Sequence, residues 1–183
     1  MSLVVLLGGA RSGKSRLALE LASASGANVT FVATAEALDE EMAQRIATHR
    51  AERPDGWATI EEPLDLERAL ADVEPQSTCV IDCLSLWVSN RMLRGDEPTD
   101  IEAAARACVA RTAGRDGLTV AVTNEVGLGV VPATALGRVY RDLLGTVNQT
   151  WVDASEQAAF VVAGRALALN PAATLLGSHG DRG

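Results

Sequence analysis

The chain has 183 residues, 48% of them hydrophobic, with a formal net charge of -8 at pH 7 and a sequence pI near 4.8. This length and apolar content predict one domain, residues 1–183, with a single sizeable core. The acidic balance repels polyanions, so we expect neither nucleic acid nor an anionic membrane as the main partner. No apolar run approaches the ~20 residues that cross a bilayer. Met1–Leu7 leads into a glycine loop rather than a cleavage site, so we expect no membrane span and a cytoplasmic protein.

The three cysteines, Cys79, Cys83 and Cys108, form an odd set without a paired C-x-x-C spacing. That pattern argues against a disulfide framework and against a structural zinc site. Cys79 and Cys83 flank an apolar run, where a buried cysteine acts as a small hydrophobe. We therefore expect reduced thiols without a catalytic role.

The amino-terminal segment is predicted to form a strand, a glycine loop and a helix. Leu3–Leu7 (LVVLL) is a continuous apolar run, which is typical of a parallel strand covered on both faces. Ser15–Ala24 follows as a helix with Leu17 and Leu21 on its inner face, and Gly26 is placed to end it.

Strands and helices then alternate along the chain. The further predicted elements, in order, are strand Val29–Ala33, helix Asp39–Arg50, helix Pro63–Val73, strand Thr78–Leu84, helices around Leu86–Met92 and Ile101–Ala113, strand Leu118–Thr123, helix Thr134–Asn148 and strand Ala158–Ala163, with Ala166–Leu169 as a candidate continuation. The polar segment Arg94–Thr99 is predicted to be a surface loop and Ser178–Gly183 a frayed tail. The alternation predicts an α/β fold class, a doubly wound and mostly parallel sheet in three α/β/α layers.

Gly8–Ser15 reads GGARSGKS and satisfies the Walker A pattern in its required context, a strand before and a helix after. The glycines let backbone N–H groups curl around a β-phosphate, and the helix N-terminus adds its positive dipole. Lys14 is placed to reach the β- and γ-phosphates and Ser15 to bind Mg²⁺. The alternative is an ordinary glycine-rich turn with a surface lysine, and the full motif in context favours the phosphate loop. The expected fold is therefore P-loop NTPase-like, of the RecA-like kind, with Mg²⁺ and a nucleoside triphosphate.

Asp82 ends a buried strand, the place where a P-loop site needs an acid for its metal. Its alternative role is the N-cap of the following helix. We favour the metal role, because the phosphate loop already requires a divalent cation.

His49 is the candidate functional imidazole, because the other histidine, His179, lies in the glycine-rich tail. The spacing of Met42, Ile46 and His49 places the three on one helix stripe, predicted to face inward. Spacing alone favours a packed core histidine. A second reading is chemical, since an imidazole with a pKa near ~6.5 can serve as a base or attack phosphorus itself.

Cationic residues surround this histidine in an otherwise acidic chain: Arg45, Arg50 and Arg53. They could clamp a phosphate, or they could be a solvated helix end that complements the helix dipole. A further candidate, Glu125, stands in the glycine-containing segment after the fourth strand. Its carboxylate could orient a nucleophile or a metal-bound water, and a polar loop cap is an equal alternative.

Several sequence blocks occur together in one order: GGARSGKS at Gly8–Ser15, FVATA at Phe31–Ala35, DEEMAQRIATHRAERP at Asp39–Pro54, W-x-T-x-E at Trp57–Glu61, DCLSLWVSN at Asp82–Asn90 and TNEVGLGVVP at Thr123–Pro132. With these blocks the chain resembles the bifunctional adenosylcobinamide kinase / adenosylcobinamide-phosphate guanylyltransferase family of cobalamin biosynthesis. The resemblance implies a corrinoid substrate and GTP and ATP as phosphoryl or nucleotidyl donors, without deciding which the kinase step prefers. It also implies a homo-oligomer, with a trimer as one option.

The resemblance implies two reactions. A kinase step moves the γ-phosphoryl group to the aminopropanol hydroxyl of adenosylcobinamide. The family histidine, matched here by His49, then attacks the α-phosphorus of GTP, and the cobinamide phosphate displaces it to give adenosylcobinamide-GDP. The implied catalytic residues are His49 and Lys14, and the implied metal ligands are Ser15 and Asp82. The implied nucleotide-contacting residues are Gly8, Gly9, Ala10, Arg11, Ser12, Gly13, Lys14, Ser15, Ala33, Thr34, Ala35, His49, Arg50, Ala51, Glu52, Glu61 and Asp82.

Two alternatives stay open beside this reading. One is a small-molecule kinase alone, with His49 structural. The other is a nucleotide-driven switch that binds a protein partner, and the lack of an Asn-Lys-x-Asp guanine signature argues against a Ras-like version of it.

Overall fold

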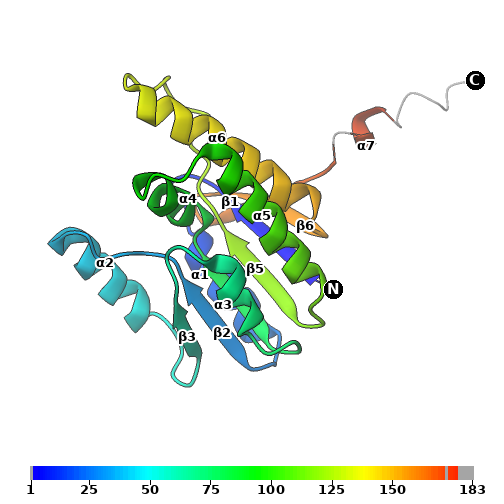
Figure 1. The fold of residues 1–183 in the computed structure, drawn as a ribbon. Coiled ribbons are helices and arrows are strands. Elements are labelled where there is room, and N and C mark those ends of the chain that lie inside the picture. The colour runs from blue at the N-terminus through cyan, green and yellow to red at the C-terminus, as the bar shows by residue number, and fades with distance from the viewer. Residues whose placement is uncertain (1, 172, 177–183) are drawn as a thin grey trace, which may run out of the picture.

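A computed structural model describes residues 2–171 and 173–176. The predicted tail 178–183, with His179, lies outside these described residues. Seven strands form one sheet in the order β3-β2-β4-β5-β1-β6-β7 (Figure 1). The strands are β1 (Ser2–Leu7), β2 (Val29–Ala33), β3 (Ala58–Glu61), β4 (Thr78–Asp82), β5 (Leu118–Val122), β6 (Gln157–Val162) and β7 (Arg165–Leu169). The helices are α1 (Lys14–Ala24), α2 (Glu40–Ala51), α3 (Leu66–Ala71), α4 (Leu84–Leu93), α5 (Pro98–Ala113), α6 (Ala135–Asp153) and α7 (Ala173–Leu176).

The sheet is parallel except at one edge. Strands β1 to β6 pair in parallel, and only β7 runs antiparallel, against β6. The prediction that Ala166–Leu169 continues the fifth strand is therefore wrong. Ala163 and Gly164 both have positive φ, 50° and 71°, which makes a two-residue hairpin turn and sends β7 back along β6.

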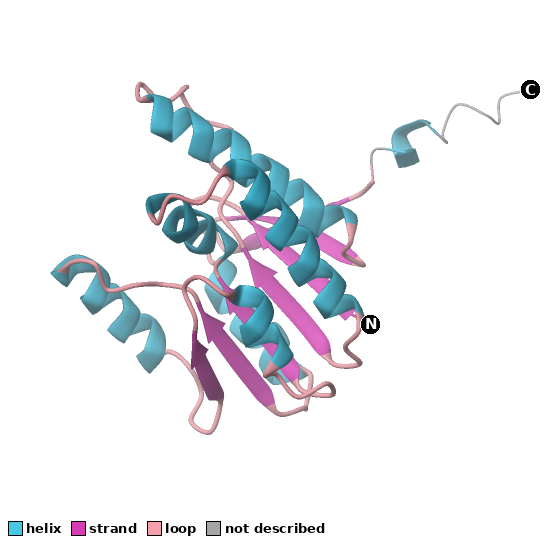
Figure 2. Cartoon of the chain, in the orientation of Figure 1, coloured by secondary structure: helices cyan, strands magenta, loops and turns pink. Residues whose placement is uncertain are grey.

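Helices cover both faces of the sheet, as the three-layer prediction required (Figure 2). Alternate residues of the central strands point to opposite faces because the side-chain period of a strand is two. One face packs against α1, with Leu6 and Val80 against Ala18. The other face, with Leu3 and Ile81, is covered by α3, α4, α5 and α6. The doubly wound, mostly parallel α/β fold is confirmed.

Local capping explains where some elements depart from prediction. The helix predicted from Pro63 begins only at Leu66, because Asp65 caps it and the Glu62 carboxylate accepts the N–H groups of Leu64 and Asp65 in a turn before it. The third predicted strand ends at Asp82, so its last predicted residues belong to the cap and start of α4. The edge strand β3 is absent from the prediction.

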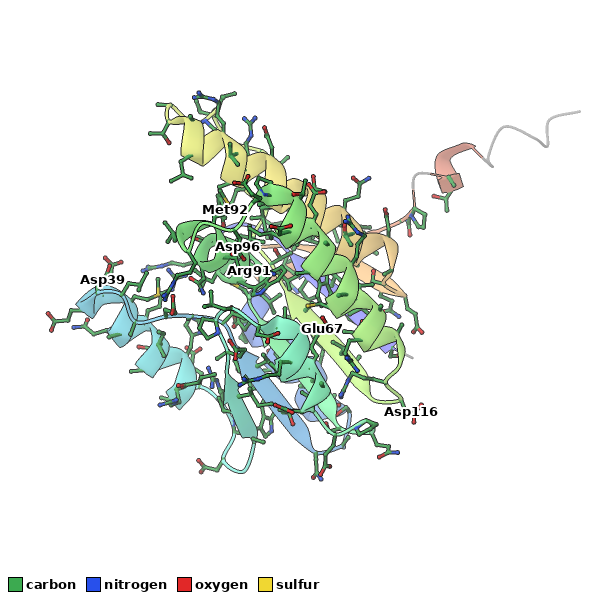
Figure 3. All side chains as sticks on the ribbon, viewed as in Figure 1. Asp39, Glu67, Arg91, Met92, Asp96 and Asp116 are labelled. Atoms are coloured by element: carbon green, nitrogen blue, oxygen red, sulfur yellow. The ribbon has the colours of Figure 1, made fainter. Side chains whose placement is uncertain are left out.

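The loop between α4 and α5 lies at the surface, as predicted. An ion pair closes it, with Arg91 Nε 2.5 Å from Asp96 Oδ2, and Figure 3 shows the two side chains together. The three cysteines are buried and unpaired, as expected. Among the described helices, none combines the length and the apolar character needed to cross a membrane.

Candidate functional site

The glycine loop connects β1 to α1 at the carboxyl end of the sheet, and its glycines are required by close contacts. A Cβ on Gly8 would lie 2.2 Å from the carbonyl oxygen of Val161, and Gly8 has φ +153°. Gly13 has φ +101°, and a Cβ there would approach Cα of Gly164 to 3.1 Å. The Gly164 N–H donates to the Ser12 carbonyl over 2.8 Å. The loop therefore rests on the β6–β7 hairpin, which fixes its path.

Helix α1 begins without a side-chain cap, since Gly13 stands at the N-cap position. Its first N–H groups are thus left for an anion, which is the arrangement that binds phosphate at helix N-termini. Ser12 is buried at the base of the loop, whereas Ala10 and Arg11 are exposed on its outer side and Gly9 has open space around it.

Lys14 is buried, and its ammonium group lies inside the curl of the loop. Lys14 Nζ donates to the Gly8 carbonyl at 3.0 Å, the Gly9 carbonyl at 2.7 Å and Ser12 Oγ at 3.4 Å. Desolvation by burial lowers the pKa of Lys14, and negative charge at Cys83 and Asp82 acts in the opposite direction. A cation held only by neutral acceptors gains most from an incoming phosphate.

Asp82 lies at the carboxyl end of β4, as predicted. Burial raises its pKa, while a hydrogen bond from the Ser15 hydroxyl and the positive charges of His49, Arg53 and Lys14 act to lower it. Ser15 lies in the first turn of α1 and Asp82 ends β4, so both offer oxygen ligands at this edge of the sheet, and Mg²⁺ prefers oxygen ligands with few protein groups. The pair therefore fits the expected metal. Asp82 is not the N-cap of α4, a position that Cys83 occupies.

Thr34 fixes the backbone beside Asp82. Its side chain is fully buried, its hydroxyl donates to the Cys83 carbonyl over 2.7 Å, and the Cys83 N–H donates back over 2.8 Å. The Asp82–Cys83 peptide bond is cis. Asn90 Nδ2 donates to the Thr34 carbonyl over 2.7 Å, so α4 holds the same segment from the other side. The segment that contains Ala33, Thr34 and Ala35 is thus tied to the end of β4 beside Asp82.

Helix α2 carries His49 and stands beyond the edge strand β3, outside the two helix layers (Figure 1). None of its residues is buried, and the His49 side chain is 39% exposed. Met42, Ile46 and His49 are half-buried on one face of the helix, as their spacing predicted. None of the three is buried, so the prediction that His49 is a packed core histidine is wrong. Figure 3 shows Asp39, which caps α2, at the outer end of this helix.

Polar contacts attach α2 to the sheet edge. Arg50 pairs with Glu61 at the end of β3. Arg53, just after the helix, places its guanidinium 3.7 Å from the Phe31 ring centroid. His49 Nδ1 lies 3.4 Å from the Glu52 carboxylate. His49, Arg50, Glu52 and Glu61 therefore lie together at one sheet edge, while Ala51 and Arg45 are exposed on the helix.

The segment after β5 meets the phosphate loop directly. The Glu125 N–H donates to the Gly8 carbonyl over 3.1 Å, and Glu125 Oε1 accepts from the Gly127 N–H over 2.5 Å. Asn148, buried in α6, donates to the Asn124 carbonyl over 3.0 Å and holds this segment from behind. Sequence reasoning missed Asn148, and the available signal was an amide placed on the apolar face of a helix.

The glycine loop, the uncapped helix start and the Ser15–Asp82 pair define a P-loop nucleotide-binding enzyme. The protein family can be stated more narrowly. The chain belongs to the cobinamide kinase / cobinamide phosphate guanyltransferase family (CobU), whose sequence model matches residues 4–169. Both named activities are group transfers, so the chain is a member of a transferase family.

Characterised relatives agree with this assignment and confirm the resemblance drawn from the sequence blocks. The bifunctional adenosylcobalamin biosynthesis protein CobP of Pseudomonas aeruginosa is 45% identical over 161 residues, which cover 87% of this chain and 92% of that protein. The bifunctional adenosylcobalamin biosynthesis protein CobU of Escherichia coli is 37% identical over 175 residues, which cover 88% of this chain and 96% of that protein.

Two solved structures have a similar fold at low sequence identity. A prototypical ATPase from the type III secretion system of pathogenic bacteria superposes with a TM-score of 0.53 and 10% identity, over 98% of this chain and 54% of that one. An ATP synthase subunit, NeqB from Nanoarcheaum equitans, superposes with a TM-score of 0.51 and 11% identity, over 87% of this chain and 45% of that one. This chain thus spans about half the length of these two proteins. At such low identity the likeness shows the fold alone, and it confirms the RecA-like class.

Proposed function

We propose that this protein phosphorylates adenosylcobinamide with ATP or GTP and then transfers GMP from GTP to the product through a guanylyl-His49 intermediate, giving adenosylcobinamide-GDP. The observation that carries the proposal is a phosphate loop with a neighbouring oxygen-ligand pair, together with a half-exposed imidazole among arginines at the same sheet edge, in a chain of this family. The acceptor is a corrinoid, and we place the reaction in the cytoplasm.

In the first step the phosphate loop would hold the triphosphate. Lys14 would exchange its neutral carbonyl partners for β- and γ-phosphate oxygens and stabilise the charge that the leaving group develops. Ser15 and Asp82 would hold Mg²⁺, which neutralises phosphate charge when it is bound. The proposed nucleotide contacts are Gly8, Gly9, Ala10, Arg11, Ser12, Gly13, Ala33, Thr34, Ala35, Arg50, Ala51, Glu52 and Glu61, in addition to these residues and His49.

In the second step His49 would be the nucleophile. The Glu52 carboxylate beside Nδ1 favours the tautomer with its proton on Nδ1, which leaves the Nε2 lone pair free. Nε2 would bond to the α-phosphorus while the bond to pyrophosphate breaks. A phosphate oxygen of the cobinamide phosphate would then bond to that phosphorus as the N–P bond breaks, which restores the imidazole.

Incubation with GTP labelled at the α-phosphorus tests the intermediate. The denatured wild-type protein should retain label that is lost in acid and kept in base, as expected for a phosphoramidate. His49→Ala should retain none, while the exposed neighbour Thr48→Ala should label normally. GTP labelled at the γ-phosphorus should leave no label, because the labelled phosphates depart as pyrophosphate. Label that persists in His49→Ala would refute His49 as the nucleophile. A wild type that retains no label would refute the covalent mechanism and leave a simple kinase or a switch.

We also propose a homo-oligomer, with a trimer as one option. Support comes from large apolar side chains exposed together in one segment and the adjoining start of α6: Leu128, Val130, Val131, Leu136 and Val139. Contiguous apolar surface of this kind marks interaction sites. Light scattering after size-exclusion chromatography should give a mass that is a multiple of the 19.1 kDa chain. A monomer at every concentration would refute this.

A further inference from the structure

The backbone of Glu125 shares a hydrogen-bond acceptor with Lys14, the residue that would bind the γ-phosphate. The Gly8 carbonyl accepts hydrogen bonds from both the Glu125 N–H, over 3.1 Å, and Lys14 Nζ, over 3.0 Å. Strand β5 lies between β1 and β4 in the sheet, so the segment after β5 emerges between the phosphate loop and Asp82. Ligands gather at this edge in open α/β sheets.

The Glu125 carboxylate is anchored at one oxygen and unpartnered at the other. Oε1 accepts from the Gly127 N–H, and a Cβ on Gly127 would approach Oε1 to 2.8 Å, so the anchor depends on a glycine there. Among residues 2–171 and 173–176, Oε2 has no hydrogen bond and no cation beside it. Glu125 as a whole residue is half-buried, while the hydrogen bond of its carboxylate to Gly127 is exposed. One anchored oxygen orients a carboxylate, and the other can accept a proton.

The remaining acidic groups just past the carboxyl ends of β2 to β4 already have partners. These pairs are Glu36 with Arg94, Glu61 with Arg50, Glu62 with Arg68 and two backbone N–H groups, Asp65 with the Arg68 N–H, and Asp82 with Ser15. A carboxylate that neutralises an arginine or caps a helix is a weaker proton acceptor than an unpaired one. Glu125 is therefore the acid that this edge leaves available.

We propose that Glu125 is the general base of the phosphoryl-transfer step, an inference that rests on the proposed function. Glu125 Oε2 would accept the proton of the acceptor alcohol as its oxygen bonds to the γ-phosphorus. The bond from that phosphorus to the β–γ bridging oxygen breaks, and the electron pair leaves with the nucleoside diphosphate. Protonated Glu125 then releases its proton to water.

Glu125→Gln is the sharpest test, because the amide oxygen can still accept from the Gly127 N–H but the side chain no longer accepts the proton. Transfer of γ-label to adenosylcobinamide, measured in a single turnover, should slow by about 10²–10⁴-fold. Glu125→Asp should give a smaller loss, because the carboxylate is kept but retracted. Mg²⁺-GTP affinity and the labelling of His49 by α-labelled GTP should stay within about twofold of wild type. Glu74→Gln, exposed before β4, is the matched control and should behave as wild type in every assay.

The outcomes separate this inference from the proposed function. If the wild type transfers the γ-phosphoryl group and Glu125→Gln does so within about threefold of its rate, Glu125 is only a loop cap and the inference fails alone. If the wild type phosphorylates no cobinamide, the proposed function fails and the inference with it. If Glu125→Gln melts well below wild type, the rates are compared at a temperature below its own Tm, and a rate within about threefold of wild type there still overturns the proposal.

Discussion

Replacing Thr34 by Val should destabilise the protein through the loss of one buried hydroxyl. The side chain is fully buried, and the substitution preserves its shape while it removes both hydrogen bonds to Cys83. The Cys83 carbonyl still accepts from Trp87 N over 3.2 Å, so the Cys83 N–H is the group left unsatisfied. An orphaned buried donor costs about 1–3 kcal/mol and a lost hydrogen bond about 1 kcal/mol.

The expected loss in unfolding free energy is therefore about 2–4 kcal/mol, which for a chain of this size lowers Tm by about 4–16 °C. Urea denaturation gives the free energy and calorimetry gives Tm. Thr34→Ser is the matched control, since it keeps the hydroxyl and loses a methyl group worth about 1 kcal/mol. The reasoning is refuted if Thr34→Val is as stable as wild type, or if Thr34→Ser loses as much stability as Thr34→Val.

Three further predictions concern thiols, a turn and an ion pair. Burial raises the pKa of Cys79 to about 12 and of Cys83 to about 11, from an ordinary value of 9.0, so Ellman's reagent should label no thiol at pH 8 before unfolding. Stability should fall as pH rises above about 9, where unfolded thiols ionise and folded ones do not. Ala163→Asn suits a left-handed turn position and should raise Tm by about 1–4 °C in calorimetry. Arg50→Met and Glu61→Gln should each cost under about 1 kcal/mol in urea denaturation, because their ion pair is exposed. Both should speed hydrogen exchange in α2, and unchanged exchange would contradict this anchoring role.

The central strands could be predicted because burial on both faces leaves a continuous apolar run in the sequence. Val29–Ala33, for example, was predicted with the bounds it has in the structure, where all five residues are buried. The phosphate loop could be predicted for a different reason, since its geometry depends on consecutive residues. Both kinds of feature leave a local signal.

The two edge strands left a weaker signal, since β3 was not predicted and Ala166–Leu169 was predicted only as a continuation of the fifth strand. Ala58–Glu61 has three exposed residues of four, and Arg165–Leu169 is exposed throughout. Each becomes a strand because a neighbouring strand offers hydrogen bonds, and β7 does so because a tight turn returns it to β6. Pairing partners far along the chain do not alter the local pattern that sequence reasoning uses.

The same limit applies to the site. Sequence reasoning put Lys14 and Asp82 at the ligand edge, because each accompanies a predicted strand end. It selected His49 for a different reason, since arginines surround it and the other histidine lies in the tail. It could not give the link between Thr34 and Cys83, which lie 49 residues apart and meet only because β2 and β4 are neighbours in the sheet. It also predicted a core contact for the His49 stripe, because amphipathic spacing does not reveal whether a core lies opposite.

The two halves of the candidate site are held by different forces. Buried backbone contacts with the β6–β7 hairpin and the sheet fix the phosphate loop. The contacts of α2 with the sheet edge are the exposed Arg50–Glu61 ion pair, worth about 0–1 kcal/mol, and the contact of Arg53 with the Phe31 ring just after the helix. Moving α2 therefore costs little free energy, because none of its residues is buried. Moving the phosphate loop costs more, because Gly8 packs so closely that an added Cβ would lie 2.2 Å from the Val161 carbonyl oxygen. The proposed reactions occur at two phosphorus atoms, γ and then α. A fixed grip on the triphosphate with an adjustable nucleophile suits that requirement, since the phosphate site can stay the same while His49 alone changes its distance.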